Sequence, residues 1–263
     1  MLSRIKAYIK VKQLTNLYEV NIATINICNR KCVYCKFGQT RKWKKLRMEA
    51  KMFRKIISDL KKINYQNLIG LFVNNEPLLD KRIFYFLKVT KKTLLHAKTY
   101  LFSNGDLLDE KNIKKLFRSG LDKLFISLHD DSRLKEVETI VGKLKKNKVI
   151  IKKEYEINKQ KYFHNRGGSI TARTVSQKRH LNKGCLLPFR QMVINPEGNV
   201  YLCCCDFYYD VVFGNAKDMS VVDTFYKNPK LNRIRKQLIL NNRKGLKLCE
   251  QCSFSGSQDK LVV

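Results

Sequence analysis

Two hydrophobic periods alternate along the first 160 residues. Short runs of β-branched and other apolar residues predict buried strands, and longer stretches with apolar residues three and four apart predict helices that bury one face. The predicted strands are 20–27, 68–73, 99–102, 123–128 and 149–157, and the predicted helices are 48–63, 80–96, 109–119 and 131–146. Because strand and helix alternate, we predict an α/β protein with a parallel sheet and helices outside it.

The pattern changes character near Tyr162. Residues 191–203 read as two short apolar strands joined by the turn Asn195-Pro-Glu-Gly198, and helical periodicity returns at 221–240. These features predict a small α+β unit after the parallel sheet. We therefore divide the chain into an N-terminal extension at 1–19, an α/β domain at 20–160 and a C-terminal domain at 161–263.

The composition indicates a folded protein and limits the cellular compartments in which we expect it. Of the 263 residues, 44% are hydrophobic, which is enough for a sizeable core. No apolar run approaches the roughly 20 residues that span a bilayer, and the N-terminus has no signal-peptide core. We expect a cytoplasmic protein without a membrane partner. In that reducing compartment, nine cysteines indicate metal or redox chemistry rather than disulfides.

The formal net charge of +32 leaves the partner open. Such a charge suits an anionic partner such as nucleic acid, a phosphorylated sugar or an acidic peptide. The lysines are scattered over nearly every predicted helix and turn, however, and no RNA-binding module or continuous basic helix is recognisable. A lysine-rich background is therefore favoured, and an RNA-directed iron–sulfur protein stays as an alternative.

The first candidate site is Cys28-Asn-Arg-Lys-Cys32-Val-Tyr-Cys35, directly after the first predicted strand. Three thiols within eight residues can converge on one small group, and no fourth ligand lies nearby in the sequence. Zinc normally completes its set of ligands locally or from a second matching pair. A [4Fe–4S] cluster held by three thiolates instead keeps one iron open for a substrate or cofactor. The spacing therefore favours a cluster, with zinc as the alternative.

This motif, with Tyr34 before its last cysteine, resembles the signature of the radical S-adenosylmethionine (SAM) enzymes. A later turn, Asn74-Asn75-Glu76-Pro77, is similar to the Gly-Gly-Glu-Pro turn that holds the SAM amino group in that family. Asparagine replaces both glycines here, and asparagine tolerates positive φ better than most residues. Ser103-Asn104-Gly105 resembles the family's Thr-Asn-Gly turn, and Ser127 matches a polar position at the end of the next strand.

The resemblance implies both a fold and a cofactor site. The fold is a partial (β/α)6 radical SAM barrel, with its chemistry at the carboxyl ends of the strands. The SAM-binding residues that the resemblance implies are Tyr34, Asn74, Asn75, Glu76, Pro77, Ser103, Asn104 and Ser127.

Four later cysteines, Cys185, Cys203, Cys249 and Cys252, form a second potential thiolate site. Their arrangement around the predicted hairpin resembles the twitch domain, which is the shortened auxiliary-cluster domain of the SPASM/twitch radical SAM enzymes. The resemblance implies a second, auxiliary [4Fe–4S] cluster, and a closed structural zinc site is the alternative. Either metal would tie the hairpin and the C-terminal helix to the barrel, because metal affinity contributes to folding free energy.

The resemblance also implies the chemistry. A cluster reduced by a flavodoxin- or ferredoxin-type donor cleaves SAM to a 5′-deoxyadenosyl radical, which abstracts a hydrogen atom from the substrate. Oxidation follows if the auxiliary cluster takes the remaining electron, epimerisation if a thiol returns a hydrogen atom, and crosslinking if the radical attacks a neighbouring group. Short enzymes of this subgroup favour oxidation of a small polar substrate of the sugar or aminocyclitol type. A ribosomal peptide substrate is the alternative.

Four further residues are candidates for catalysis. Cys204 and Cys205 follow Cys203 directly and are either small apolar fillers or hydrogen donors. Arg166 lies in the glycine-rich turn at 165–168, and His129 lies two residues after Ser127; both are candidates to assist removal of a substrate proton. The other histidines are predicted to lie on the surface, namely His96, His164 and His180.

Overall fold

The structure is a computed structural model that describes residues 9–32, 34–35, 44–142, 148–153, 163–171 and 175–256. The predicted boundary between the two domains, at 160/161, lies outside the described residues, and the division of the chain stays a prediction. Within the described part of the chain, no helix combines the length and apolar character needed to cross a membrane.

The centre of the molecule is one eight-stranded sheet of order β10-β9-β8-β1-β2-β3-β4-β5. Its strands are β1 (Glu19–Ile22), β2 (Leu68–Gly70), β3 (Lys98–Ser103), β4 (Lys123–Leu128), β5 (Val149–Lys153), β8 (Gln191–Ile194), β9 (Asn199–Tyr201) and β10 (Val212–Asn215). Strands β1 to β5 are parallel neighbours in chain order, and β8 lies parallel to β1 on its other side. The predicted α/β class with a parallel sheet is confirmed.

The sixth parallel strand, β8, comes from the C-terminal region instead of following β5. It pairs with β1 in register from Glu19↔Gln191 to Ile22↔Ile194. The chain then turns back, so that β9 pairs antiparallel to β8 and β10 antiparallel to β9. The N-terminal and C-terminal regions therefore share one continuous sheet.

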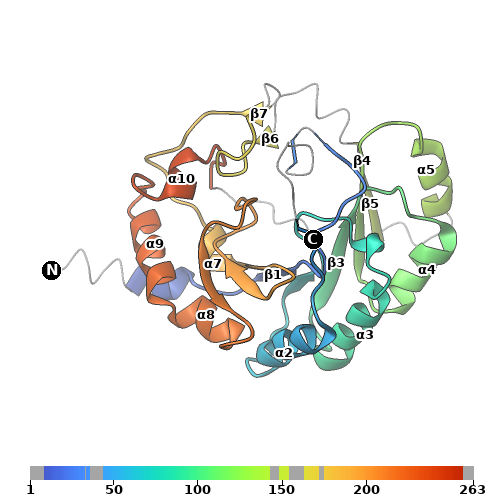
Figure 1. The fold of residues 1–263 in the computed structure, drawn as a ribbon, viewed down its shortest axis with the longest axis horizontal. Coiled ribbons are helices and arrows are strands. Elements are labelled where there is room, and N and C mark those ends of the chain that lie inside the picture. Colours follow the sequence, from blue (N-terminus) through green and yellow to red (C-terminus); the bar gives the residue numbers. More distant parts are fainter. Residues whose placement is uncertain are drawn as a thin grey trace.

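Four helices cover the outer face of β1 to β5 (Figure 1). They are α2 (Ala50–Lys61), α3 (Ile83–Thr93), α4 (Glu110–Arg118) and α5 (Leu134–Gly142). Their apolar stripes bury against the outward side chains of the strands, among them Val20, Leu101 and Ile126. This is the main hydrophobic core, and it leaves the other face of the sheet to form the interior of the open barrel.

The described C-terminal region adds the predicted hairpin and four short helices. The turn at 195–198 joins β8 to β9, and Gly198 takes the positive φ of 86° that this turn requires. The helical periodicity predicted at 221–240 is confirmed, and it is divided between two helices, α8 (Val221–Lys227) and α9 (Pro229–Ile239). Asn228 ends the first and caps the second by accepting a hydrogen bond from Leu231 N at 3.0 Å, with proline at the favoured first helical position.

The remaining elements lie around the hairpin. They are the helices α7 (Leu187–Arg190) and α10 (Lys247–Gln251), the one-turn helix η2 (Pro77–Leu79), and a separate two-stranded parallel sheet of β6 (Phe163–His164) and β7 (Val175–Ser176). Helices α8, α9 and α10 lie on the side of the molecule away from α4 and α5 (Figure 1).

The inner face of the sheet is crowded where β1, β2 and β3 run side by side. A Cβ atom at Gly70 would lie 2.2 Å from Asn21 Oδ1 and 2.9 Å from the Tyr100 ring. Only a residue without a side chain fits between these groups. Gly142, at the end of α5, has no atom within 4 Å of the equivalent position.

We therefore expect Gly70→Ala to destabilise the fold by about 1–3 kcal/mol, the usual cost of overpacking a filled interior. Gly142→Ala is the matched control and should stay within about 0.5 kcal/mol of the parent protein. Anaerobic thermal unfolding followed by circular dichroism measures both. Equal midpoints for the two variants would show that the barrel interior is looser than the structure indicates.

Candidate active site

The three cysteines of the first motif lie in a loop after β1, at the carboxyl edge of the parallel strands. Each is half-buried, and Cys35 N donates to Cys32 O at 2.9 Å to close a turn. Burial, with smaller effects of the two neighbouring thiols, raises the pKa of Cys28 to about 11. Burial also raises the pKa of Cys32, so Cys28 and Cys32 ionise readily only when a metal takes the place of their protons. Residues 33 and 36–43 lie outside the described residues.

The turn at 74–77, after β2, is joined to the cysteine loop and to the turn after β3. Glu76 N donates to Ile27 O at 3.0 Å. The buried Glu76 carboxylate accepts hydrogen bonds from Leu78 N at 3.0 Å, Ser103 Oγ at 3.0 Å and Asn104 N at 2.8 Å. The structure thus brings together the first motif and the predicted SAM turns. The Glu76 carboxylate itself accepts its hydrogen bonds from groups of this chain.

Burial raises the pKa of Glu76 to about 7, while these hydrogen bonds oppose the shift. A cationic group bound beside Glu76 would return it to the carboxylate form, because an opposite charge favours ionisation. The site therefore suits an ammonium such as the amino group of SAM.

Two buried amide donors lie on the same turn, the Nδ2 atoms of Asn74 and Asn75. Asn75 Nδ2 has no hydrogen-bond partner among the described residues, and Asn74 lies within reach of the Tyr209 phenol alone. Leaving such donors unpaired costs about 1–3 kcal/mol each, so the turn fits a polar cofactor that supplies acceptors. Neither residue has a positive φ. The turn therefore does not need the glycines of the family pattern, and asparagine is accommodated without strain.

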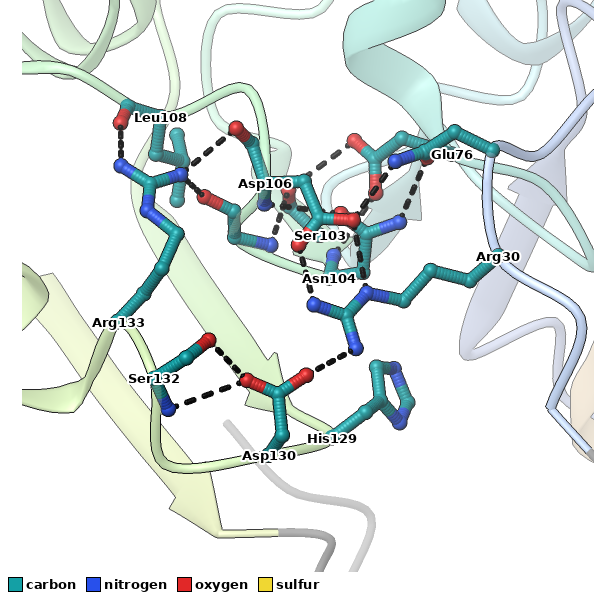
Figure 2. A network of polar contacts seen from close by, with 12 residues as sticks. Arg30, Glu76, Ser103, Asn104, Asp106, Leu108, His129, Asp130, Ser132 and Arg133 are labelled. Atoms are coloured by element: carbon teal, nitrogen blue, oxygen red, sulfur yellow. Dashed lines mark hydrogen bonds and ion pairs between the residues drawn. The ribbon is translucent and has the colours of Figure 1, made fainter.

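An ionic network clamps the cysteine loop to the loops after β3 and β4, as Figure 2 shows. Arg30, between the first two cysteines, donates from Nε to Asp106 Oδ2 at 2.7 Å and from Nη1 to Asp130 Oδ2 at 2.7 Å. Arg133 holds the Asp106 loop from its other side through three backbone carbonyls, those of residues 105, 106 and 108. Asn29 also donates to Asp106, at 2.7 Å.

The carboxylates of this network remain ionised well below neutral pH. Hydrogen bonds from Ser132 and then Arg30 lower the pKa of Asp130 to about 2. At Asp106 burial acts in the opposite direction, but hydrogen bonds and the charge of Arg30 still leave the pKa below its usual range. The clamp is therefore fully charged at the pH at which enzymes normally work.

His129 lies beside the cysteine loop. Its Nδ1 contacts the Tyr34 hydroxyl and lies 3.8 Å from Cys32 Sγ. Burial, and then the positive charge of Arg30, lower the pKa of His129 and keep the imidazole neutral at physiological pH. A neutral imidazole can accept a proton, but the geometry ties this one to the thiol loop. The predicted SAM contact Ser127 lies on β4, in register with Lys152 of β5.

The second group of cysteines surrounds a small cavity of about 20 Å³ at the opposite end of β1 and β8. The four predicted ligands line it together with one more cysteine, in the order Cys185, Cys203, Cys205, Cys249 and Cys252. In the described part of the chain, no three metal-binding side chains are close enough to hold a single metal ion. Thiols around a cavity fit a cluster of several atoms better than a closed tetrahedral zinc site.

The adjacent Cys204 and Cys205 have different surroundings. Cys204 N donates to Gln191 Oε1 at 3.0 Å. The pKa of the Cys204 thiol is lowered by a hydrogen bond from Cys205, with a smaller contribution from the charge of Arg166, and Glu19 acts in the other direction. The Cys204 side chain is therefore near Arg166 and the barrel interior, whereas Cys205 lines the cavity.

The prediction that His164 lies on the surface is wrong. Its Nδ1 accepts a hydrogen bond from Arg166 N at 3.3 Å and lies 3.9 Å from Cys205 Sγ. Burial, and then the charge of Arg166, lower the pKa of His164 to about 3. The predicted residue Arg166 has a positive φ of 47°, and its guanidinium lies over the Phe207 ring at 5.0 Å. No motif around His164 could have indicated this contact.

Sequence reasoning also missed Tyr209. Its backbone has the left-handed φ of 61°, and its ring stacks on Tyr201 at 4.5 Å. The Tyr209 phenol is close enough to Asn74 and Cys35 for both to influence its pKa, which burial raises above its usual value. The loop after the second group of cysteines therefore reaches the predicted SAM turn. A non-glycine residue held in this backbone region is the signal that marks it.

The barrel interior between the two groups of thiols is polar and aromatic. The Glu19 carboxylate accepts hydrogen bonds from Asn21 Nδ2 at 2.8 Å and Gln191 Nε2 at 2.9 Å, and also from the Tyr100 hydroxyl. Nearer to β5, Phe102 and Phe125 stack at 4.5 Å, with Lys152 Nζ 4.8 Å from the Phe102 ring. The inner face of the sheet therefore combines mutually hydrogen-bonded polar groups with ring faces.

We expect Arg30→Lys to loosen the first cysteine loop, because lysine keeps the charge but lacks the planar fork that reaches both carboxylates. Iron bound at this loop, roughly half of the total in a protein with two clusters, should be lost to a chelator several times faster than in the parent. Arg54→Lys is the control, since Arg54 contacts only the exposed Tyr85 hydroxyl at 2.9 Å. Equal rates of iron loss in the two variants would contradict the clamp.

Two family models match the chain. The radical SAM superfamily matches residues 22–163, which is 142 of the 263 residues. SPASM, an iron-sulfur cluster-binding domain, matches residues 185–253 and contains all four predicted auxiliary ligands. The first group of cysteines therefore lies within the radical SAM match and the second within the SPASM match, and the structure places the two groups apart in the same way.

Similar proteins support the same assignment. An S-adenosyl-L-methionine-dependent 2-deoxy-scyllo-inosamine dehydrogenase of Niallia circulans is 27% identical over 228 residues, which cover 86% of this chain and 88% of that protein. The crystal structure of BtrN in complex with AdoMet and 2-DOIA has the same fold, with a TM-score of 0.82, 24% identity and coverage of 92% of this chain and 95% of that one.

A more distant structure, Streptococcus suis SuiB bound to S-adenosylmethionine, has a TM-score of 0.56 and 17% identity, and covers 88% of this chain and 71% of that one. It shares the general fold only. The chain therefore belongs to the radical SAM superfamily and carries a SPASM/twitch domain, and its cofactors are SAM and two [4Fe–4S] clusters.

Proposed function

We propose that this radical SAM enzyme oxidises a small polar substrate of the sugar or aminocyclitol type, converting an alcohol to a ketone. The observation that carries the proposal is the polar barrel interior between the first cysteine loop and the cavity lined by the later cysteines. A substrate held there is near both cofactors. The similarity to a dehydrogenase that acts on 2-deoxy-scyllo-inosamine supports the same class of reaction and substrate.

In this proposal Cys28, Cys32 and Cys35 hold the SAM-binding cluster, and Cys185, Cys203, Cys249 and Cys252 hold the auxiliary one. The bound cofactors supply a 5′-deoxyadenosyl radical that abstracts a hydrogen atom from the substrate, and an acceptor for the electron that remains. Asn74, Asn75 and the Glu76 carboxylate offer the donors and the negative charge that a zwitterionic cofactor needs.

The chain's own task is then to position the alcohol and remove its hydroxyl proton. The Arg166 guanidinium is close enough to Cys204 to lower the pKa of that thiol, and a fixed positive charge there stabilises a developing alkoxide. His129 is neutral and able to accept a proton. We therefore assign the electrostatic role to Arg166 and the proton-accepting role to His129.

A thiol that returns hydrogen would give epimerisation instead. Cys204 is the residue that favours this second candidate, because its thiol lies toward Arg166 and Glu19 rather than in the auxiliary cavity. The two outcomes differ in product mass and in isotope uptake. A peptide substrate, an RNA partner, the flavodoxin- or ferredoxin-type donor and a cytoplasmic location stay predictions from the sequence.

The SAM site can be tested without a substrate. Glu76→Ala removes the carboxylate that orients the Ser103-Asn104 turn and faces the cofactor amino group. We expect SAM to bind more weakly by on the order of 2 kcal/mol, or roughly thirtyfold. Isothermal titration calorimetry under anaerobic conditions measures the SAM affinity, and Glu138→Ala, on the exposed face of α5, is the control. Unchanged affinity in Glu76→Ala would exclude this turn from the SAM site.

The reaction itself is tested with candidate aminocyclitols and sugars under reducing, anaerobic conditions. We expect a product two hydrogens lighter than the substrate and one SAM consumed per turnover, measured by mass spectrometry. Replacing Cys28, Cys32 and Cys35 together by alanine is the control, and it should abolish SAM cleavage. A product of unchanged mass that gains one deuterium in heavy water, and loses this uptake in Cys204→Ala or Cys205→Ala, would overturn oxidation in favour of epimerisation.

A further inference from the structure

Five thiols surround a cavity whose proposed occupant has only four positions for protein ligands. The proposed ligands come from three separate segments and line this one cavity, so they lie around one centre. The fifth thiol, Cys205, is only 2% exposed and lines the same cavity. Its closest thiols are those of Cys203, Cys204 and Cys252, all within hydrogen-bonding reach.

The backbone explains why Cys205 joins this group and Cys204 does not. Asp206 N donates to Cys203 O at 3.1 Å and Phe207 N donates to Cys205 O at 3.0 Å, which folds residues 203–207 into a tight turn. The turn directs the side chains of Cys203 and Cys205 to the cavity and leaves Cys204 outside its lining. The two neighbouring cysteines are therefore a natural matched pair for experiments.

We propose that Cys205 is a fifth sulfur at the auxiliary centre, one that does not ligate iron but donates its single S–H to one of the neighbouring ligand sulfurs, that of Cys203 or Cys252. This inference rests on the proposed ligand set and on the proposed role of the auxiliary cluster as an electron acceptor. Hydrogen bonds to the sulfurs of an iron–sulfur cluster are one of the features that set its reduction potential. A donor of this kind stabilises the more negative, reduced state and makes the cluster a better acceptor.

The surroundings of Cys205 support this role. The remainder of the cavity lining is largely apolar and includes Leu187, Leu248 and Phe254. Few other groups compete for the thiol, and a hydrogen bond is stronger in such a medium. His164 Nδ1, at 3.9 Å on the other side, already accepts a hydrogen bond from Arg166 N. Cys205 is therefore held between a filled acceptor and the ligand sulfurs.

The test uses the full chain, reconstituted anaerobically, with Cys28, Cys32 and Cys35 replaced by alanine so that only the auxiliary cluster gives a signal. Cys205→Ala is compared with Cys204→Ala in this background. Iron content and an electron paramagnetic resonance redox titration are the readouts. We expect roughly four irons per chain in both variants, and a more negative potential in Cys205→Ala alone. Cys205→Ser keeps a hydrogen-bond donor, because a hydroxyl donates at least as well as a thiol, and its potential should stay closer to the parent than that of Cys205→Ala.

Two outcomes would overturn the inference. Loss of the auxiliary iron in Cys205→Ala, with full retention in Cys204→Ala, would make Cys205 a ligand. Equal potentials in the two alanine variants would show that Cys205 does not act on the cluster. If the triple background does not fold, the same titration on Cys205→Ala and Cys204→Ala with the first motif intact decides between these results.

Neither readout needs a substrate. A potential that falls in Cys205→Ala while no alcohol is ever oxidised would contradict the proposed function and leave this inference standing. If the protein oxidises an alcohol but the cluster potential is the same with and without Cys205, the proposed function stands and this inference is contradicted.

Discussion

The parallel pairing of β1 with β8 is the constraint on which the arrangement of this enzyme depends. β1 leads into the first cysteine loop at its carboxyl end. The β8–β9 hairpin returns the chain to the opposite end of these strands, so that Cys203 lies level with Gln191 and with its strand partner Glu19. Four paired residues in each strand correspond to roughly 13 Å. The two groups of thiols are thereby held apart on one rigid sheet, with the barrel interior between them.

Buried polar groups, rather than exposed ion pairs, organise the carboxyl end of the sheet beside the first cysteine loop. The Glu76 carboxylate is 1% exposed and accepts three hydrogen bonds from two different segments. Removing one partner of such a buried network leaves the others unsatisfied, which costs more than the bonds contribute when complete. Arg30 extends the network to the cysteine loop through two carboxylates at once, and this bidentate, partly buried geometry makes it more than a surface ion pair.

The C-terminal domain does more than hold an auxiliary cluster. Its loop from Cys203 to Val211 is closed by the buried Asp206 carboxylate, which accepts hydrogen bonds from Asp210 N and Val211 N at 2.9 Å each. One end of the loop supplies cysteines to the cavity, and the other places Tyr209 near Asn74 and Cys35. This short, well-anchored segment therefore connects the cysteine-lined cavity with the turn at 74–77.

By itself the sequence determined the α/β class, the apolar character of the parallel strands and the division of the cysteines into two groups, because hydrophobic period and cysteine spacing are local properties. Strand β4 has the predicted bounds, Lys123–Leu128. The break between α8 and α9 also has a local signal, the pair Asn228-Pro229, although the apolar period continues across it.

Only the tertiary structure decided which strand lies beside β1, because pairing between segments some 170 residues apart leaves no local trace. The same holds for His164 and Tyr209, whose roles come from contacts with Cys205 and Asn74 that the folded chain alone creates. The tertiary structure also gives Cys204 and Cys205 different surroundings. Two identical neighbouring residues look alike in a sequence, and a tight turn directs only one of them into the cavity.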